Sequence, residues 1–345
     1  MFEFNYLKSY LFNSTLKTLN GRLNKLPFKK FMKILVTGGC GYKGSVLIPQ
    51  LLSYGHKVIN LDTQWFGNHL EDNPNLINVK EDVRHIDSKI LENVNSIIHL
   101  ANIANDPAVV LNPTLSWETN VLASHQLADK AVRSGVTQII YASSGSVYGV
   151  KDEPLVTEDL ELVPLSVYNK TKMVSERVFL SYKDKIKIHC IRPATVCGLS
   201  PRMRLDVAVN LLTYQALKNG KITVLGGNQT RPNVHIKDMV NIYVHFLNNI
   251  HIPSGCFNAG FENISIIDIA KKVQKYIDAE IVIKESNDPR SYRQDSKKLL
   301  NTGFKPLYGI DDAINEIKIA FENNSLKQDD SCYTVKWMEK LDLKI

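Results

Sequence analysis

One stretch near the start of the chain, residues 33–44, constrains the fold more than any other. Its first part, Lys33 to Thr37, is an apolar run rich in branched side chains, which is typical of a buried parallel strand. Its second part spaces glycines as Gly39-x-Gly41-x-x-Gly44, and a helical pattern follows over 45–54. In this context the glycines predict a dinucleotide-binding turn. They permit the tight bend, the approach of a pyrophosphate and close packing of helix on strand, and the helix N-terminus attracts phosphate.

An acidic residue lies where such a turn requires one. A second predicted strand, 56–61, ends just before Asp62, about 20 residues beyond the glycines. A carboxylate there binds the 2′-hydroxyl of a ribose and repels a 2′-phosphate, and the following Thr63 and Gln64 supply no cation. The pattern therefore favours NAD over NADP, and the alternative is that Asp62 only opens a turn.

Predicted strands and helices alternate from residue 33 onward. Further strands are expected at 76–80, 96–101, 138–144 and 187–192, with helices at 117–135 and 166–182 and a proline-containing loop at 102–113. This alternation predicts an α/β fold, a doubly wound parallel, Rossmann-like sheet. Beyond about residue 195 the pattern loosens, which indicates a smaller C-terminal substrate-binding lobe. We expect a basic extension at 1–31, an NAD-binding domain at 32–194 and mainly the substrate lobe at 195–345.

A tyrosine and a lysine supply the candidate chemistry. Tyr168 and Lys172 lie four residues apart on a predicted helix, which places both on one face. A neighbouring ammonium favours the phenolate, so this pair predicts a tyrosine of lowered pKa that acts as a general base on a sugar hydroxyl. The alternative for such a pair is a solvated helix face. Ser144, at the end of a predicted strand, can hold the substrate oxygen beside the phenol and favours the catalytic interpretation.

Together these residues resemble the extended short-chain dehydrogenase/reductases, the NAD-dependent nucleotide-sugar epimerases and dehydratases, and most of all their UDP-glucose 4-epimerase-like branch. The resemblance covers roughly residues 32–310. Its motifs are Thr37 to Gly44, Asp62, Asp82-Val83, His99-Leu100-Ala101, Asn120, Ser143 to Gly149, Tyr168/Lys172, Arg192-Pro193 and Gly226 to Arg231.

The resemblance implies a role for each matching position. The catalytic set is Ser144, Tyr168 and Lys172. The residues implied at the NAD site are Gly38, Gly41, Tyr42, Gly44, Asp62, Asp82, Val83, Ala101, Asn120 and Lys172, with Asn120 behind the site. Ser144 and Arg231 are implied at the substrate, a nucleotide-diphosphate sugar, and Arg293 or Arg290 is implied to join Arg231 there. Arg204 either meets substrate phosphates or faces solvent, and His99 and His235 are expected to be structural.

The branch of the family depends on two neighbouring positions. The 4,6-dehydratases carry an Asp-Glu pair after the hydroxyl residue, and the sugar-acid decarboxylases usually keep the glutamate, whereas this chain has Gly145 and Ser146. The resemblance therefore implies an epimerase that acts through a transient 4-keto sugar. The alternatives are a dehydratase or keto-sugar reductase of the same family, and a non-catalytic NAD-binding subunit. A homodimer is usual among the relatives.

Composition bears on partners and location. The formal net charge is +7, but six basic residues against Glu3 place +5 of it in residues 1–31. The rest shows no basic stripe with interleaved aromatics, so no nucleic-acid partner is expected. No apolar run is long enough for a membrane span. The five cysteines lack paired or metal-ligand spacing, which favours a cytoplasmic protein without a metal site. Residues 1–31 resemble a transit peptide or follow an upstream start, and we expect them to be dispensable.

Overall fold

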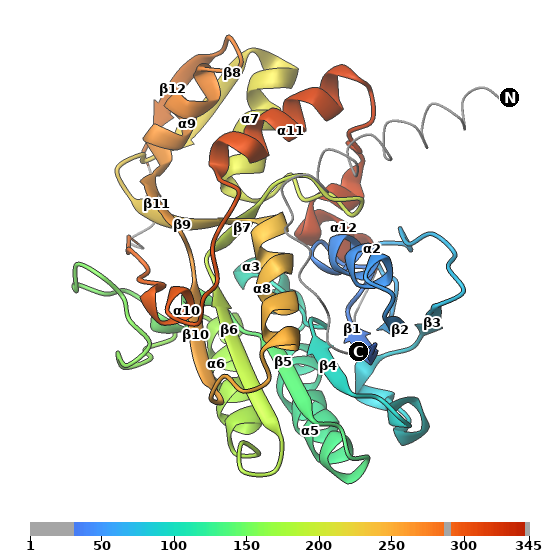
Figure 1. The fold of residues 1–345 in the computed structure, drawn as a ribbon. Coiled ribbons are helices and arrows are strands. Elements are labelled where there is room, and N and C mark those ends of the chain that lie inside the picture. Colours follow the sequence, from blue (N-terminus) through green and yellow to red (C-terminus); the bar gives the residue numbers. More distant parts are fainter. Residues whose placement is uncertain (1–30, 286–290, 342–345) are drawn as a thin grey trace, which may run out of the picture. The chain divides into compact units, whose positions relative to one another are not determined.

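The computed structural model describes residues 31–285 and 291–341. The chain divides into two units, Met1–Phe31 and Met32–Ile345, and the second contains the central sheet. Its centre is a seven-stranded parallel sheet with the strand order β10-β6-β5-β4-β1-β2-β3 (Figure 1). The strands are β1 (Lys33–Thr37), β2 (Lys57–Asp62), β3 (Leu76–Lys80), β4 (Ser96–His99), β5 (Gln138–Ala142), β6 (Lys187–Pro193) and β10 (Gly255–Ala259).

The strand order changes direction beside β1. Strands β2 and β4 pair with its two sides, so that Val36 lies opposite Asn60 on one side and Ile98 on the other. In doubly wound sheets, ligands bind beyond the carboxyl ends of the strands at such a switch point. The predicted site residues that follow β1, β2, β4 and β5 therefore lie at one edge.

Helices cover both faces of the sheet. Helices α5 (Ala123–Arg133) and α6 (Val167–Leu180) pack on one face over an apolar core, while α2 (Gly44–Ser53) and α8 (Ile236–Asn248) contact each other on the opposite face (Figure 1). This core is built from buried branched side chains, for example Leu35, Ile97 and Ile139. On each strand, the residues that face this core alternate with residues that face the other side of the sheet. Burial on both faces explains why these strands are apolar throughout.

A smaller lobe follows the sheet. Its strands form a three-stranded sheet, with β9 (Thr230–His235) between β7 (Thr195–Cys197) and β11 (Glu262–Ser265), and a parallel pair, β8 (Lys221–Leu225) with β12 (Glu280–Lys284). Three helices pack on them around a second apolar core: α7 (Ala208–Asn219), α9 (Ile266–Gln274) and α11 (Ile310–Glu322). Two shorter helices, α10 (Lys297–Leu300) and α12 (Thr334–Lys340), also occur in the C-terminal part of the chain.

The predicted doubly wound α/β fold is confirmed. The predicted boundary near residue 194 does not coincide with the edge of the sheet, because β10 and α8 come from the later half of the chain and complete the central sheet and its helical cover. The five cysteines are buried and none forms a disulfide.

The prediction of a loop over 102–113 is wrong. This segment contains α3 (Asp106–Leu111), and α4 (Pro113–Trp117) begins at its end. Each helix has a proline in its first turn, where the missing backbone N–H is not needed. Asparagine side chains cap both, Asn105 through Ala108 N and Asn112 through Leu115 N, each at 2.9 Å. The prolines therefore mark helix starts. A π-helical turn (Glu118–Leu122) then joins α4 to α5.

Candidate active site

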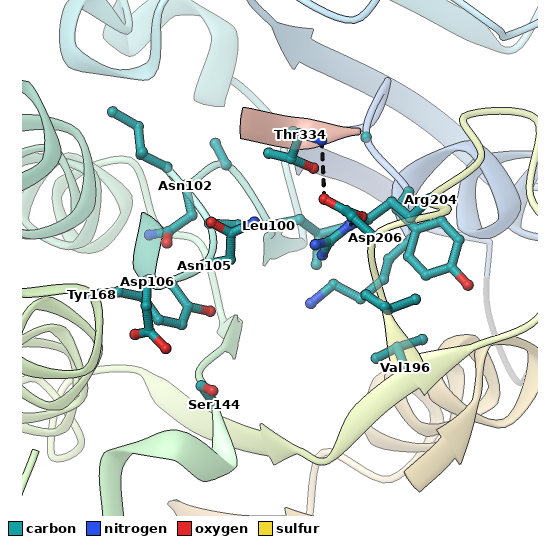
Figure 2. Close-up of a pocket in the computed structure, with 18 of the residues that line it drawn as sticks. Leu100, Asn102, Asn105, Asp106, Ser144, Tyr168, Val196, Arg204, Asp206 and Thr334 are labelled. Carbon is teal, nitrogen blue, oxygen red and sulfur yellow. Dashed lines mark hydrogen bonds and ion pairs between the residues drawn. The ribbon is translucent and has the colours of Figure 1, made fainter. Parts of the chain in front are cut away.

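A cavity of about 870 Å³ opens at the carboxyl ends of the central strands (Figure 2). Its lining combines the glycine turn, the ends of β2, β4 and β5, the start of α6 and segments of the C-terminal lobe. Most of the predicted site residues line it, namely Gly38, Gly41, Tyr42, Gly44, Asp62, Asp82, Val83, Ala101, Ser144, Tyr168, Lys172, Arg204 and Arg231. Residues that are far apart in the sequence thus meet at one place.

Two predicted residues do not line the cavity. Asn120 is buried behind it, where its side chain bonds the backbone N–H and C=O of Ile103 at 2.9 and 3.2 Å and Thr171 Oγ1 at 3.0 Å. It thus supports the site from behind by joining the wall after β4 to helix α6, which carries Tyr168 and Lys172. Arg293 is exposed, and its neighbour Tyr292 lines the cavity instead. Arg290 lies outside the described residues.

Two glycines of the turn lie so close to backbone atoms that they leave no room for a side chain. A Cβ on Gly38, which has φ +74°, would lie 2.5 Å from the backbone nitrogen of Ala101. A Cβ on Gly44 would lie 2.4 Å from the Cα of Gly39. The turn therefore sits tightly against β4 and against its own helix, and it keeps a backbone surface open to the cavity.

Asp62 both closes this turn and faces the cavity. Its carboxylate accepts hydrogen bonds from the backbone N–H groups of Cys40, at 2.9 Å, and Gln64, at 2.6 Å. Burial raises the pKa of Asp62, and these two hydrogen bonds oppose the rise. The two interpretations of Asp62, as a turn residue and as a cavity residue, are thus compatible.

The catalytic candidates occupy the other end of the cavity. Tyr168 and Lys172 lie in the first turns of α6, whose N-cap Ser166 accepts from Asn169 N at 3.1 Å. The Lys172 ammonium donates to the backbone carbonyl of Ala142 at 2.6 Å and lies 5.9 Å from the centre of the Tyr168 ring. Ser144 follows β5, and its hydroxyl lies 2.7 Å from that of Ser146. Figure 2 shows Tyr168 and Ser144 beside the same space.

The prediction of a lowered pKa for Tyr168 is wrong for the protein chain alone. Burial raises the pKa of this phenol to about 12, although a hydrogen bond with Ser144 opposes the rise. Lys172 does not compensate, because burial and the nearby Lys43 lower the pKa of its own ammonium well below the usual value. The pair is in place, but charge from a bound group is needed to favour the phenolate.

Sequence reasoning missed several charged side chains in the lining, among them Lys43 and Asp106. Lys43 belongs to the glycine turn, and burial together with Arg204 lowers its pKa to about 8. Asp106, at the start of α3, faces the cavity near Tyr168 (Figure 2). Lys43 could have been predicted at the site, because it is a charged residue inside the glycine motif. Asp106 was missed because the segment that contains it was predicted to be a loop, whereas it begins helix α3.

The C-terminal segment also closes the cavity. Thr334, at the start of α12, donates its backbone N–H to Asp206 at 3.0 Å, and Asp206 in turn binds Arg204 at 2.8 Å (Figure 2). Trp337 donates its indole N–H to the backbone carbonyl of Trp65 at 2.6 Å. Residues beyond the family resemblance thus build one wall of the site.

The two histidines that we expected to be structural have internal partners. His99 is fully buried between Thr37 Oγ1, at 2.7 Å, and Ser124 Oγ, at 3.2 Å, and burial lowers its pKa to about 3. His235 caps α8 through Lys237 N and does not line the cavity. Within residues 31–285 and 291–341, no cluster of three potential metal ligands occurs. No helix in these ranges has the length and apolar character of a membrane span.

Several lining groups fit NAD. The amide of Asn102 and the hydroxyl of Thr119 are buried at the cavity and have no hydrogen-bond partner among the described residues. Buried polar groups in folded proteins are normally paired, so these atoms call for a bound partner. Together with the glycine turn and the Asp62 carboxylate, they suit the polar groups of a dinucleotide.

Comparison with known proteins gives consistent relatives. A UDP-glucose 4-epimerase of Lactobacillus helveticus is 29% identical over 315 residues, which cover 82% of this chain and 95% of that protein. A UDP-glucuronic acid decarboxylase of Arabidopsis thaliana is 28% identical over 336 residues, 90% of this chain and 75% of that protein. The crystal structure of a Bacillus cereus UDP-glucuronic acid 4-epimerase with UDP-glucuronic acid and NAD has a TM-score of 0.74 and 28% identity, over 85% of this chain and all of that one.

Solved neighbours contain NAD, and the family whose model matches is NAD dependent, so NAD is the cofactor of this chain. The relatives differ in the reaction that follows. The model of the NAD dependent epimerase/dehydratase family matches residues 34–260, which include the glycine turn, Asp62, Ser144, Tyr168 and Lys172. On these grounds the chain belongs to the NAD dependent epimerase/dehydratase family, within the extended short-chain dehydrogenase/reductases.

Proposed function

We propose that this protein is a nucleotide-sugar 4-epimerase that oxidises the C4 hydroxyl of its substrate transiently and reduces it again from the opposite face. The observation that carries the proposal is the meeting of Tyr168, Lys172 and Ser144 in the cavity that also contains the glycine turn. The UDP-glucose 4-epimerase and the UDP-glucuronic acid 4-epimerase among the relatives support it.

Each catalytic residue has a defined task. Tyr168 takes the proton of the C4 hydroxyl as general base and returns it in the reverse step. Ser144 binds the same oxygen while it becomes a carbonyl, and Lys172 binds the ribose next to the nicotinamide. Bound NAD supplies the acceptor for the C4 hydride, and its nicotinamide charge favours the phenolate that burial alone disfavours. The product is released without net oxidation.

The residues after Ser144 favour epimerisation over the competing reactions. Position 145 carries no acid, and a Cβ there would lie 3.1 Å from the carbonyl of Pro193 and 3.2 Å from Gln294 Nε2. Ser146 interacts with Ser144. This packing supports an enzyme without the acidic pair of the 4,6-dehydratases. The 4-keto sugar is therefore expected to rotate within the site and to be reduced again from its opposite face.

Basic side chains suit the phosphates of cofactor and substrate. Lys43 extends from the turn that approaches the pyrophosphate, and no acidic partner for it occurs among the described residues. Arg231 and Arg204 line the C-terminal side of the cavity, where the nucleotide diphosphate of the substrate is expected. Arg293 is exposed and does not line the cavity, so it is not proposed at the phosphates.

The test is incubation of purified protein with a panel of nucleotide sugars, without added cofactor, followed by NMR. The proposal expects a 4-epimer of one sugar and no accumulation of NADH. A 4-keto or dehydrated product supports a dehydratase, and dependence on added NADH supports a reductase. Protein that binds NAD and converts no sugar supports the non-catalytic subunit.

Three further expectations concern the whole protein. The resemblance implies a homodimer, which light scattering tests directly. A cytoplasmic location is expected, and imaging of the tagged full chain tests it. Deletion of residues 1–31 should leave a folded and active enzyme, and an insoluble product would contradict the dispensable role of that segment.

A further inference from the structure

Asp106 brings a carboxylate to the side of the cavity on which Tyr168 lies. Figure 2 shows its carboxylate near the Tyr168 phenol, on the side toward Ser144, with Arg204 across the space. The residue before it, Asn105, has φ +79°, a conformation that side-chain-bearing residues rarely adopt. Strained backbone of this kind is concentrated at functional sites. The strain here turns the chain so that α3 begins at the cavity wall.

A hydrogen bond from Ser166 holds the Asp106 carboxylate in place. Ser166, the N-cap of α6, donates its hydroxyl to Asp106 Oδ1 while it accepts the backbone N–H of Asn169. Asp106 is therefore linked to the turn of α6 that carries Tyr168. Two segments that are 60 residues apart in the sequence hold one acid beside one phenol.

A role in proton transfer at Tyr168 does not explain why Asp106 lies beside this phenol. After burial and the opposing hydrogen bond from Ser144, the charge of Asp106 raises the pKa of Tyr168. Arg204 opposes this rise, and Tyr292 adds to it. A negative charge beside a phenol hinders formation of the phenolate. The Ser166 hydrogen bond nevertheless holds the Asp106 carboxylate in the lining of the cavity, beside the space that a bound sugar would occupy.

We propose that Asp106 binds the sugar directly, by accepting a hydrogen bond from a hydroxyl next to the one that Tyr168 deprotonates. This inference rests on the proposed function, because it places a sugar between the two side chains. An ionised carboxylate only accepts hydrogen bonds, and a hexose ring offers hydroxyl donors on neighbouring carbons. Asp106 thereby selects sugars with a free hydroxyl beside the reacting carbon.

The test compares the affinity of NAD-loaded protein for UDP-glucose and for UDP by calorimetry. UDP lacks the sugar and serves as an internal control. The variants are Asp106→Ala, Asp106→Asn and Asp87→Asn, of which the last removes an exposed carboxylate that does not line the cavity. Asp106→Ala should weaken binding of UDP-glucose about 10- to 100-fold, the range of a hydrogen bond to a charged group, and leave UDP unchanged. Asp87→Asn should change neither affinity.

A second measurement, of the ultraviolet absorbance of tyrosinate against pH, tests the charge of Asp106. The signal of Tyr168 is identified as the part that Tyr168→Phe removes. Asp106→Asn keeps an acceptor oxygen and removes the charge, so in this variant the signal of Tyr168 should appear at lower pH than in the wild type. Equal weakening of UDP and UDP-glucose, or unchanged affinity for UDP-glucose, overturns the inference. So does a wild type that binds UDP-glucose no more tightly than UDP. If the affinities change as expected but no sugar is converted, the proposed function fails and the sugar contact stands.

Discussion

Glu176 and Arg192 form a buried ion pair with two hydrogen bonds, Nε to Oε1 at 2.9 Å and Nη2 to Oε2 at 2.8 Å. Glu176 follows Lys172 by one helical turn on α6, and Arg192 lies near the end of β6. The hydroxyl of Ser143, next to Ser144, also donates to Glu176. One carboxylate therefore fixes α6, which carries Tyr168 and Lys172, against the strand ends beside the candidate site.

Glu176→Ala should destabilise the protein strongly. Removal of one partner of a buried ion pair leaves the other charge unpaired, which costs about 3–5 kcal/mol. The change in the free energy of unfolding, measured with urea, tests this. Glu280→Gln, which breaks an exposed ion pair with Lys221, should have little effect. Similar small losses for both variants would contradict the anchoring role of Glu176.

Gly44→Ala should disrupt the turn and the binding of NAD together. The added Cβ meets the backbone of Gly39 at 2.4 Å, and overpacking of this kind costs about 1–3 kcal/mol. The control is Gly135→Ala, where φ is +74° but no atom lies within 4 Å of the new Cβ. That variant should lose stability through backbone strain and still bind NAD normally. Normal NAD affinity in Gly44→Ala would contradict the tight contact.

Lys43 should make phosphate binding dependent on pH. Because its pKa is lowered to about 8, its ammonium is charged below that pH and becomes neutral above it. A bound phosphate favours the charged form, so affinity should fall as pH rises beyond about 8. Titrations of NAD and of UDP between about pH 6.5 and 9.5 show which phosphate is involved.

Lys43→Met should remove this pH dependence and weaken the same ligand about 10- to 100-fold at neutral pH. Lys57→Met, at an exposed position of β2, provides the control and should behave like the wild type. A pH dependence that persists in Lys43→Met would assign it to another group.

The central strands could be predicted from the sequence because burial on both faces makes them apolar without interruption. The run Ile97-Ile98 in β4 is an example. The strand β10 could not be predicted in this way, since its sequence Gly-Cys-Phe-Asn-Ala carries no strong strand signal. Its place depends on pairing with β6, a contact between distant parts of the chain.

The residues of the candidate site differ in the same way: the sequence predicts those placed by local structure and misses those placed by distant contacts. Tyr168, Lys172 and Ser144 were predictable because spacing on one helix and the end of one strand place them locally. Asp106 and Thr334 were not, because both reach the cavity through contacts with partners far away in the sequence. The pKa of Tyr168 was also out of reach, since burial, rather than the nearest charge, dominates it.

The most direct test follows the hydrogen on C4 of the substrate. Wild-type protein and Tyr168→Phe are incubated with a nucleotide sugar deuterated at C4, beginning with UDP-glucose, without added cofactor, and the products are examined by NMR. The account predicts that the wild type forms the 4-epimer with deuterium still on C4, whereas Tyr168→Phe retains NAD and forms no product. Loss of the label to solvent, or turnover by Tyr168→Phe near the wild-type rate, would contradict it.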